Sequence, residues 1–442
     1  MPVKVGMVSL GCSKNLVDSE RMLYKFRQKG YQLVTEPGLS DVAVVNTCGF
    51  IQSAKEEAIE TILELAKLKE EGTIKKIIVT GCLSERYREE TAEQFPEVDA
   101  VVGIGNQEDI TDVIERVLAA EKVISFNSKD KLAITGDRII STLPFFAYLK
   151  IAEGCDNCCS YCAIPQIRGR FRSASMEDIL KEAEWLADNG VTEIIVIAHD
   201  TTRYGEDLYG KAMLPELLKR LCTIEKLRWI RVLYCYPERI TDELIEVIAD
   251  QEKIVKYMDI PIQHCNEEIL KNMNRSGSLE YLTDLMTKIR NRIPDIALRT
   301  TLITGFPGET EKQFEELAEF VNDIKFDRLG CFAYSQEEGT AAAGFENQID
   351  EDIKNHRAEI IMQQQQLISE EKNAEKEGSE LEAVVEGFDK YAVCYFGRTD
   401  FDAPDIDGKV FFNSEKQLEI GQYVIIRITD TLDYDLIGEV ID

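Results

Sequence analysis

Four cysteines lie within eight positions of the segment EGCDNCCSYC, residues 153–162. Cys155, Cys159 and Cys162 have the spacing C-x-x-x-C-x-x-C, at which three thiolates can hold one cubane iron–sulfur cluster. Such clusters usually have four cysteine ligands, so the fourth iron would be open to a substrate or cofactor. An open position marks a catalytic rather than a structural metal site. The spacing therefore predicts a reactive cluster at these three cysteines.

Cys158 allows two other uses of the same segment. Cys155-x-x-Cys158 has the spacing of half a zinc site, but no second close pair and no nearby histidine completes it. Cys158 and Cys162 could also be ligands in another register. Because the C-x-x-x-C-x-x-C spacing uses the other three cysteines, we expect Cys158 to be a bystander.

A second group of thiols is spread over the first hundred residues. Cys12, Cys48 and Cys82 each end an apolar run, and they are 36 and 34 residues apart, about one strand–helix unit each. In open parallel sheets, ligands bind beyond the carboxyl ends of the strands. Three thiols delivered to one edge by successive strands would converge there. The alternative is that three buried cysteines happen to end strands.

An open parallel sheet, expected over residues 1–140, must position these cysteines. Short apolar runs predict strands, and a helical period with charged residues opposite predicts a helix over 53–72. Strands that alternate with helices indicate a parallel sheet with right-handed crossovers. The predicted strands are 3–10, 41–48, 76–82 and 98–103.

A second α/β region is predicted over 141–375, with helices such as 175–190 and 310–324 between its strands. Six strand–helix units indicate a partial (β/α)6 barrel, with its site at the carboxyl ends of the strands. A long polar helix over 349–378 connects it to the tail. The six predicted strands are 146–155, 192–200, 229–237, 257–264, 296–309 and 327–335.

The tail, 378–442, changes to short strands separated by Gly, Asp and Asn, which predicts a small all-β barrel. From 381 onward it holds 14 acidic and 5 basic residues, and the whole chain has a net charge of -30. Such a surface repels polyphosphate and favours a basic protein as partner.

Composition also indicates the compartment. No apolar run reaches the roughly 18 residues needed to cross a bilayer, and the N-terminus resembles a first strand rather than a signal peptide. We therefore expect a cytoplasmic protein without a membrane partner, in which twelve cysteines are not a disulfide framework. Five further cysteines are assigned to core packing: Cys222, Cys235, Cys265, Cys331 and Cys394.

The 155–162 segment, with aromatic Tyr161 before the last cysteine, resembles the signature of the radical S-adenosylmethionine enzymes. That resemblance implies that the cofactor's amino and carboxylate groups chelate the open iron, and that its reductive cleavage gives a 5′-deoxyadenosyl radical. Nearly the whole chain is similar to the methylthiotransferases, which add an N-terminal three-cysteine domain and a small barrel called TRAM. The similar segments are 10–20, 46–51, 80–82, 153–173 and 305–310.

The methylthiotransferase likeness implies a second 4Fe–4S cluster at Cys12, Cys48 and Cys82, whose free iron holds the sulfur species to be transferred. It also implies that S-adenosylmethionine is used twice, once to methylate sulfur and once to remove a hydrogen from the acceptor. Both clusters must then face one cavity, since a carbon radical cannot wait for diffusion. An electron donor is required.

Within that family, Ser13-Lys14-Asn15 and Gly49-Phe50-Ile51 resemble the branch that acts on a ribosomal protein, whereas the tRNA branch tends to carry Gln-Met-Asn at the first position. The implied substrate is an aspartate of a basic small-subunit ribosomal protein, whose β-carbon receives a methylthio group. We expect a monomer, with nucleic acid disfavoured as direct substrate. The alternatives are methylthiolation of a tRNA adenosine and a noncatalytic iron–sulfur carrier.

Other site residues are less specific, and no catalytic residue is predicted beyond the cluster ligands. Tyr161, His199, Thr301, Thr304 and Gly305 are candidates for contact with the cofactor, because they lie beside the cysteines or at strand ends. The last three could equally form a turn before a helix.

Arg168, Arg170 and Arg172 form a basic cluster directly after the cysteine segment. Guanidinium groups suit carboxylates, so these arginines could hold the substrate aspartate or the cofactor carboxylate. The alternative is that they pair with neighbouring acidic helices.

Overall fold

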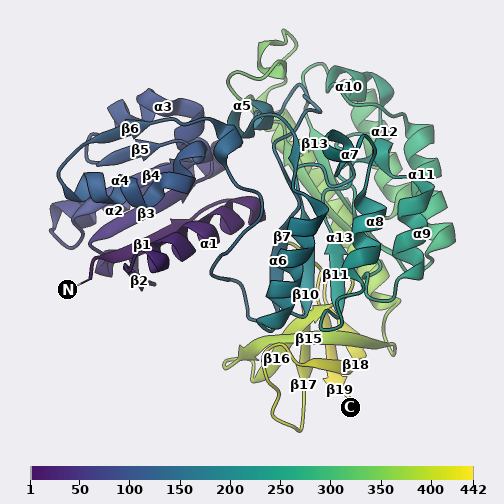
Figure 1. Ribbon diagram of the computed structural model, residues 1–442. Helices are drawn as coiled ribbons and strands as arrows, with labels where there is room; N and C mark the ends of the chain where they lie inside the picture. Colours follow the sequence, from purple (N-terminus) through teal and green to yellow (C-terminus); the bar gives the residue numbers. More distant parts are fainter. Residues whose placement is uncertain (1, 442) are drawn as a thin grey trace.

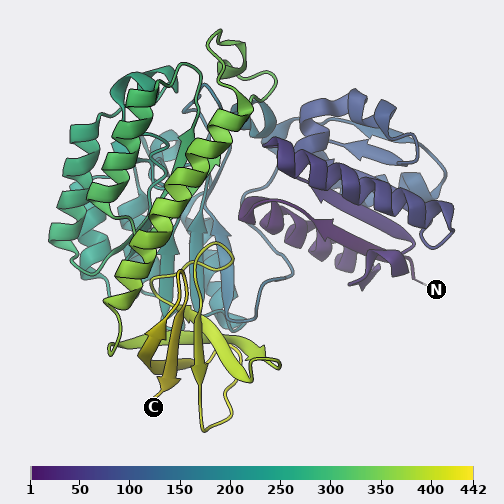
Figure 2. The same ribbon diagram turned by 180° about the vertical axis from the view of Figure 1, so that it is seen from behind.

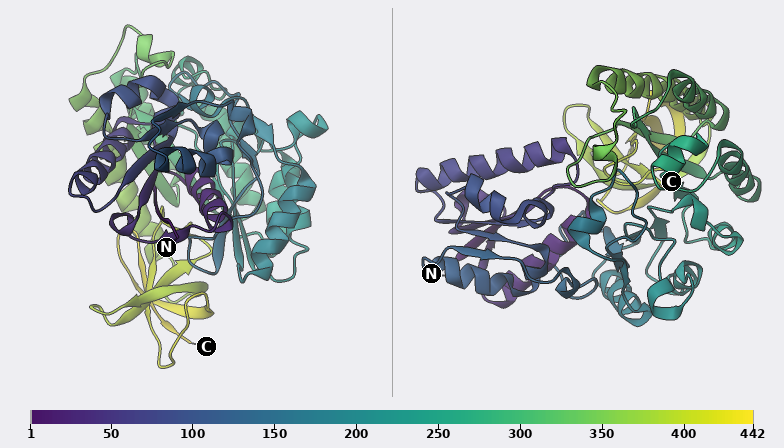
Figure 3. Two further views of the ribbon diagram at one scale, coloured as in Figure 1. Left: turned by 60° about the vertical axis from the view of Figure 1, so that its left-hand side comes forward. Right: turned by 90° about the horizontal axis from the view of Figure 1, so that it is seen from above.

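The computed structural model describes residues 2–441. Met1 and Asp442, the outer limits of the predicted domains, lie outside the described residues. Figure 1 shows an N-terminal α/β domain beside a larger central α/β domain, with a small barrel below the latter. The right-hand view in Figure 3 also shows the two α/β domains side by side. This is the fold class that the sequence predicts.

Within residues 2–441, the N-terminal sheet has six parallel strands in the order β2-β1-β3-β4-β5-β6. The four predicted strands are confirmed, and two short edge strands, β2 and β6, are additional. The strands are β1 (Lys4–Ser9), β2 (Gln32–Val34), β3 (Val42–Thr47), β4 (Lys76–Gly81), β5 (Ala100–Val102) and β6 (Val123–Ser125). The helices are α1 (Ser13–Gln28), α2 (Gln52–Glu70), α3 (Cys82–Gln94) and α4 (Ile110–Leu118).

The central domain contains two three-stranded parallel sheets, in the orders β7-β10-β11 and β12-β13-β14. A parallel bridge between Ile230 and Ile254 continues from one to the other, so that they form a six-unit partial barrel. All six predicted strands are present, with earlier ends than expected. They are β7 (Phe146–Lys150), β10 (Glu193–Ile197), β11 (Trp229–Val232), β12 (Tyr257–Asp259), β13 (Ala297–Thr304) and β14 (Arg328–Ala333).

Amphipathic helices cover the outer face of this partial barrel, because each buries an apolar stripe against the strands. The short pair β8 (Ala152–Glu153) and β9 (Arg172–Ser173) brackets the cysteine loop. The helices are α5 (Ile164–Arg168), α6 (Met176–Asp188), α7 (Glu206–Tyr209), α8 (Leu214–Leu221), α9 (Asp242–Asp250), α10 (Glu267–Asn272), α11 (Leu279–Arg292) and α12 (Glu311–Ile324).

The long polar helix α13 (Glu351–Ala374) runs along the back of the central domain toward the tail (Figure 2). Within residues 378–441, five strands then close into a barrel in the order β15-β16-β17-β19-β18. The last strand, β19, is additional to the sequence prediction. The strands are β15 (Glu380–Asp389), β16 (Cys394–Thr399), β17 (Val410–Asn413), β18 (Tyr423–Thr431) and β19 (Leu436–Val440).

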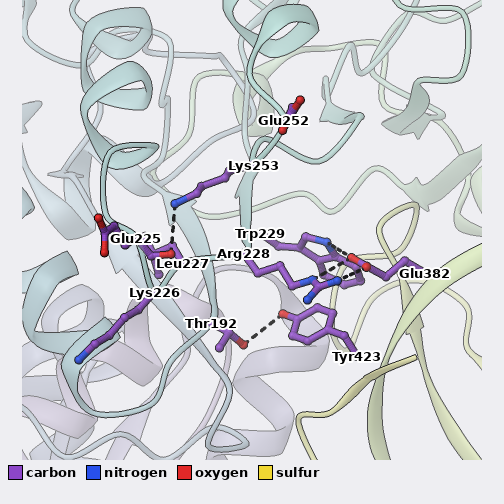
Figure 4. A pocket seen from close by; sticks show the side chains of 10 residues that line it. All are labelled: Thr192, Glu225, Lys226, Leu227, Arg228, Trp229, Glu252, Lys253, Glu382 and Tyr423. Atoms are coloured by element: carbon purple, nitrogen blue, oxygen red, sulfur yellow. Dashed lines mark hydrogen bonds and ion pairs between the residues drawn. The ribbon is translucent and has the colours of Figure 1, made fainter. Parts of the chain in front are cut away.

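The barrel covers the amino ends of the central strands, opposite the cysteine loop. Arg328 on β14 binds Asp402 at 2.6 Å, and Arg299 on β13 lies 3.4 Å from Asp407. Glu193 at the start of β10 is fully buried between Arg231 of β11 and Arg398 of the barrel. Figure 4 shows the edge of this interface, where Arg228 and Trp229 contact Glu382.

Part of the tail's acidity therefore neutralises arginines of the central domain rather than facing solvent. Within the described part of the barrel, the exposed acidic residues are Glu380, Asp405, Glu415, Glu419, Asp430, Asp433 and Glu439. The exposed basic ones are Lys390, Lys409, Lys416 and Arg427. The outer surface of the barrel is thus less acidic than its composition indicates.

No helix within residues 2–441 has the length and apolar character needed to cross a membrane.

Candidate functional site

The N-terminal cysteines follow three adjacent strands of the sheet, β1, β3 and β4, at their carboxyl ends. Gly11 permits this convergence: at a φ of 87°, an added Cβ would lie 2.9 Å from the Cys48 Sγ. Burial and the nearby Cys12 thiol raise the pKa of Cys48. Burial raises the pKa of Cys82 to about 12, with Cys48 and Cys12 also raising it. Gly11, the neighbour of Cys12, is thus packed against the Cys48 side chain at the edge of the sheet.

The second set of cysteines lies on the loop after β8, at the carboxyl side of the first central strand. Burial raises the pKa of Cys155 to about 12, and the Cys159 thiol adds to that rise. Burial and the Cys159 and Cys155 thiols raise the pKa of Cys162. Cys158, by contrast, is exposed and has a φ of 50°. The three cysteines of the predicted spacing are thus partly buried on one loop, whereas Cys158 differs from them by its exposure.

The two sets of cysteines meet at the interface between the α/β domains. The buried Cys82 side chain packs against Ala163 and Ile167 of the central domain. Ala163 directly follows Cys162. A residue that contacts Cys82 of the first set is therefore the sequence neighbour of a cysteine of the second set. The sequence predicts that both sets face one cavity, and this packing shows that they lie at the same interface.

A buried ion network joins the domains beneath the cysteines. Arg168 of α5 donates to Asp18 of α1 at 2.6 Å and to Glu153 at 3.3 Å, while Lys150 of β7 also binds both carboxylates. All four side chains are at most 1% exposed. Burial would raise the pKa of Glu153, but the charges of Lys150 and Arg168 lower it well below its usual range. The network therefore stays charged and fixes the orientation of the domains.

Arg168 also links this network to the N-terminal cysteines. Its guanidinium donates to the Asn15 Oδ1 at 3.0 Å. Burial would lower the pKa of Arg168, but Cys82, Glu153 and Asp18 raise it well above its usual range. The Arg168 charge is thus fully engaged with acceptors of the protein itself. Of the two alternatives for this residue, ion pairing is the one that the structure supports.

Glu337, on the loop after β14, makes a second connection between the domains. Its carboxylate accepts from Arg86 of α3 at 2.7 Å and from Lys55 of α2 at 3.0 Å. Arg86 also donates to the Gly49 carbonyl at 2.9 Å, next to Cys48. The loop of Cys48 and the helix of Cys82 are therefore held against the central domain by one carboxylate.

A tyrosine hydroxyl contacts the second set of cysteines directly. Tyr236, on the segment after β11, lies with its oxygen 3.0 Å from the Cys159 Sγ. The Arg275 guanidinium stacks on the Tyr236 ring at 4.0 Å and approaches the Tyr161 hydroxyl at 3.4 Å. Within residues 2–441 no carboxylate forms an ion pair with Arg275, whose other contact is the Pro261 carbonyl at 2.8 Å. This aromatic–cationic group borders the cysteine loop.

The remaining candidates fall in two different environments. His199 lies at the domain interface, where burial lowers its pKa to about 3 and its Nδ1 is 3.9 Å from Glu153. Thr304 is buried and donates to the Lys354 carbonyl at 3.3 Å, and a Cβ on Gly305 would collide with the Lys354 side chain at 2.3 Å. These two residues are accounted for by the packing of α13. Thr301 is partly buried and accepts from Arg299 at 3.4 Å.

The other two arginines of the basic cluster do not reach the cysteines. Arg170 is exposed, and Arg172 donates to the carbonyls of Lys129 and Asp130 at 3.1 Å each. Several residues around the cysteines were not predicted as site residues from the sequence. They are Asn15, Asp18, Lys150, Glu153, Tyr236, Arg275 and Glu337. In the sequence, Asp18 could have been recognised as a site residue, because it is a carboxylate on the buried side of an amphipathic helix.

The donor chemistry fits iron–sulfur clusters. All twelve cysteines lie within residues 2–441 and none forms a disulfide. In the same residues, no group of three or more His, Cys, Asp or Glu side chains is arranged to hold a single metal ion. Soft thiolates in threes are the ligands of a cluster with one open iron. The cavity drawn in Figure 4, about 490 Å³, lies at the barrel interface and contains none of these cysteines.

Sequence profiles of known families match three parts of the chain. They are the uncharacterized protein family UPF0004 over residues 4–103, the radical SAM superfamily over 149–321 and the TRAM domain over 378–441. Among solved structures, the radical S-adenosylmethionine methyltransferase TsrM from Kitasatospora setae, with tryptophan and a SAM analogue, superposes with a TM-score of 0.53. It is 12% identical, with 74% of this chain and 72% of that chain covered, and the likeness concerns the fold.

Curated relatives match over nearly their whole length. The ribosomal protein uS12 methylthiotransferase RimO of Thermoanaerobacter sp. strain X514 is 48% identical over 436 residues, which cover 98% of this chain and 99% of that protein. The protein of the same name from Clostridioides difficile strain 630 is 49% identical over 441 residues, 99% of each chain.

Proposed function

Because the chain belongs to the RimO family of ribosomal protein uS12 methylthiotransferases, we propose that it transfers a methylthio group to the β-carbon of an aspartate of uS12. The enzyme class follows from this membership together with the radical SAM region of the central domain. The observation that carries the proposal is the junction of the two cysteine sets, where Cys82 packs against Ala163. Sulfur transfer by two clusters requires such proximity.

We propose that Cys12, Cys48 and Cys82 hold one 4Fe–4S cluster and that Cys155, Cys159 and Cys162 hold the other. When bound, the clusters and S-adenosylmethionine supply the electron, the radical and the methylated sulfur. The protein's own residues orient and enclose them. Arg275, which forms no ion pair with a carboxylate within residues 2–441, is placed beside Cys159 to hold the cofactor's carboxylate.

The ion network of Asp18, Lys150, Glu153 and Arg168 would keep the two clusters at a fixed separation during transfer. It lies in a region from which water is excluded, and this suppresses side reactions of a reactive intermediate. Residues 1–140, 141–375 and 378–442 would act as sulfur-cluster domain, radical domain and TRAM barrel. We further propose that the protein acts as a monomer in the cytoplasm, where a one-electron donor reduces the radical cluster.

The test of this function is the intact mass of every ribosomal protein from cells with and without the gene. Loss of one methylthio increment from uS12, restored by the intact gene but not by a Cys159→Ala gene, would support the proposal. If uS12 is unchanged and a modified tRNA adenosine disappears, the acceptor is wrong and the enzyme class stands. If neither changes, sulfur transfer itself is wrong.

Replacing Tyr236 by phenylalanine is expected to lower the reduction potential of the radical cluster. Once Cys159 is a thiolate, only the Tyr236 O–H can donate in the 3.0 Å contact. Hydrogen bonds to cluster sulfurs favour the reduced, more negative state. Loss of one bond worth about 1 kcal/mol corresponds to roughly 40 mV for one electron. An EPR-monitored redox titration of the holoenzyme measures it.

Tyr391→Phe is the matched control, because Tyr391 is 99% exposed on the barrel. Its potential should equal that of the parent enzyme. An unchanged potential in the Tyr236 variant would show that the hydroxyl does not reach the cluster ligand in the loaded enzyme.

A further inference from the structure

Lys14 is a mostly buried lysine with no anionic partner within residues 2–441. It stands two residues after Cys12, in the first turn of α1, and only 4% of it is exposed. Its ammonium lies 3.2 Å from the centroid of the Tyr234 ring. Within residues 2–441, no carboxylate or other acceptor forms a hydrogen bond or ion pair with it.

Such a group is costly to bury. Transfer of an ammonium out of water is compensated only by pairing, and a cation–π contact contributes about 0.5–2 kcal/mol. The neighbouring buried cations, Lys150 and Arg168, are each paired with Asp18 and Glu153. Lys14 is the exception among these three, so its surroundings lack the negative charge that would match it.

Two further buried polar atoms within residues 2–441 lack a hydrogen-bond partner, one on the residue before Lys14 and one on the residue two positions after β10. The Ser13 hydroxyl is buried without a hydrogen-bond partner, and so is the Nδ1 of His199. The first turn of α1 contains no acidic residue, and Cys12 at the N-cap makes no side-chain cap. The N-terminus of a helix attracts anions through its free N–H groups and its dipole. The uncapped first turn of α1 and the Lys14 ammonium within it therefore both favour an anion.

The backbone of Tyr234 is held in a way that fixes its ring beneath Lys14. Its φ is 61°, in the left-handed region that a tyrosine rarely adopts. Its N–H donates to Asp259 at 2.9 Å, and its carbonyl accepts from the Thr201 N–H at 3.1 Å. Strained residues held in this way concentrate at functional sites.

The position of this pair relates it to both clusters. Lys14 is two residues from Cys12, while Tyr234 is two residues from Tyr236, whose hydroxyl contacts the Cys159 Sγ. The Lys14–Tyr234 contact therefore joins the helix that follows Cys12 to the segment after β11, whose Tyr236 touches Cys159. An acceptor carbon that loses hydrogen at one cluster and gains sulfur at the other must lie close to this contact.

We propose that Lys14 binds the side-chain carboxylate of the substrate aspartate and is a specificity-determining residue of this enzyme. The inference rests on the proposed function. The carboxylate is one bond from the β-carbon, so holding it with a charge-assisted hydrogen bond also orients the carbon that reacts. An acceptor without a carboxylate would leave the ammonium buried and unpaired, so it would be rejected.

A competing role for Lys14 is to balance the negative charge of the N-terminal cluster itself. The two roles differ in what they change. A residue that serves the cluster alters its EPR spectrum and reduction potential with no substrate present. A residue that holds the substrate leaves those signals unchanged and alters binding of the acceptor.

The test is a double-mutant cycle on binding, with the holoenzyme and purified unmodified uS12. The enzyme changes are Lys14→Met and the charge-conserving Lys14→Arg, and the substrate change is the acceptor aspartate to asparagine. Lys14→Met and the asparagine substrate should each weaken binding about tenfold or more, as loss of a bond between charged groups does. Combined, they should cost little more than either alone. Lys14→Arg should recover part of the affinity.

Lys29→Met, at the exposed end of the same helix, is the matched control and should bind as the parent does. Additive effects in the cycle would overturn the proposal. So would a shifted cluster potential in Lys14→Met with unchanged binding. If the parent enzyme neither binds nor modifies uS12, the proposed function fails instead, which distinguishes the two failures.

Discussion

Replacing Cys159 by alanine is expected to abolish methylthiolation of uS12 and cleavage of S-adenosylmethionine. With two ligands left, the loop after β8 cannot hold a cluster that exposes one open iron. Iron per chain should fall from about eight to about four, because the N-terminal cysteines are untouched. Iron and sulfide analysis, together with deoxyadenosine release in the presence of reductant, measures both effects.

Cys158→Ala is the matched control one position away. Cys158 is exposed and outside the predicted spacing, so this variant should keep the full iron content and the rate of the parent. If Cys158→Ala loses the cluster and Cys159→Ala retains it, the register proposed for the segment is wrong. Cys48→Ala should also lose about half of the iron, yet it should still release deoxyadenosine.

Replacing Arg168 by methionine is expected to destabilise the junction of the two α/β domains by about 3–5 kcal/mol, the usual cost of removing one partner of a buried ion pair. Asp18 and Glu153 would then share the single charge of Lys150, with all three side chains almost fully buried. Denaturant unfolding of the holoenzyme, with limited proteolysis of the linker before β7, measures the loss. Product formation should fall with it, because the cluster separation is no longer fixed.

Arg170→Met is the control for this change, because Arg170 lies two positions away and is exposed. It should unfold at the same denaturant concentration as the parent. Arg168→Lys should lie between the two, since it keeps the charge but cannot bind Asp18, Glu153 and Asn15 together. Equal unfolding of Arg168→Met and the parent would show that the network does not hold the domains together.

The sequence by itself determined the fold class and the cysteine pattern of the site. Hydrophobic periodicity is a local property, so it predicted the main strands of both α/β domains and the helix over 53–72. The cysteine spacing at 155–162 is also local, since three ligands of one cluster come from one loop. Even the distant Cys12, Cys48 and Cys82 could be brought together, because parallel strands deliver their carboxyl ends to one edge.

The sequence could not determine which charges are paired, because pairing depends on side chains from different domains. Arg168 meets Asp18 of α1, and Glu337 meets Arg86 of α3, across separations of 150 and 251 residues. The acidity of the barrel is another case, since Asp402 and Asp407 face arginines of the central domain. In the sequence, Lys14 was noted only as part of the motif Ser13-Lys14-Asn15. Only the tertiary structure decided that its side chain is mostly buried, unpaired within residues 2–441 and beside Tyr234, because burial is a property of the packed domains and not of the local chain.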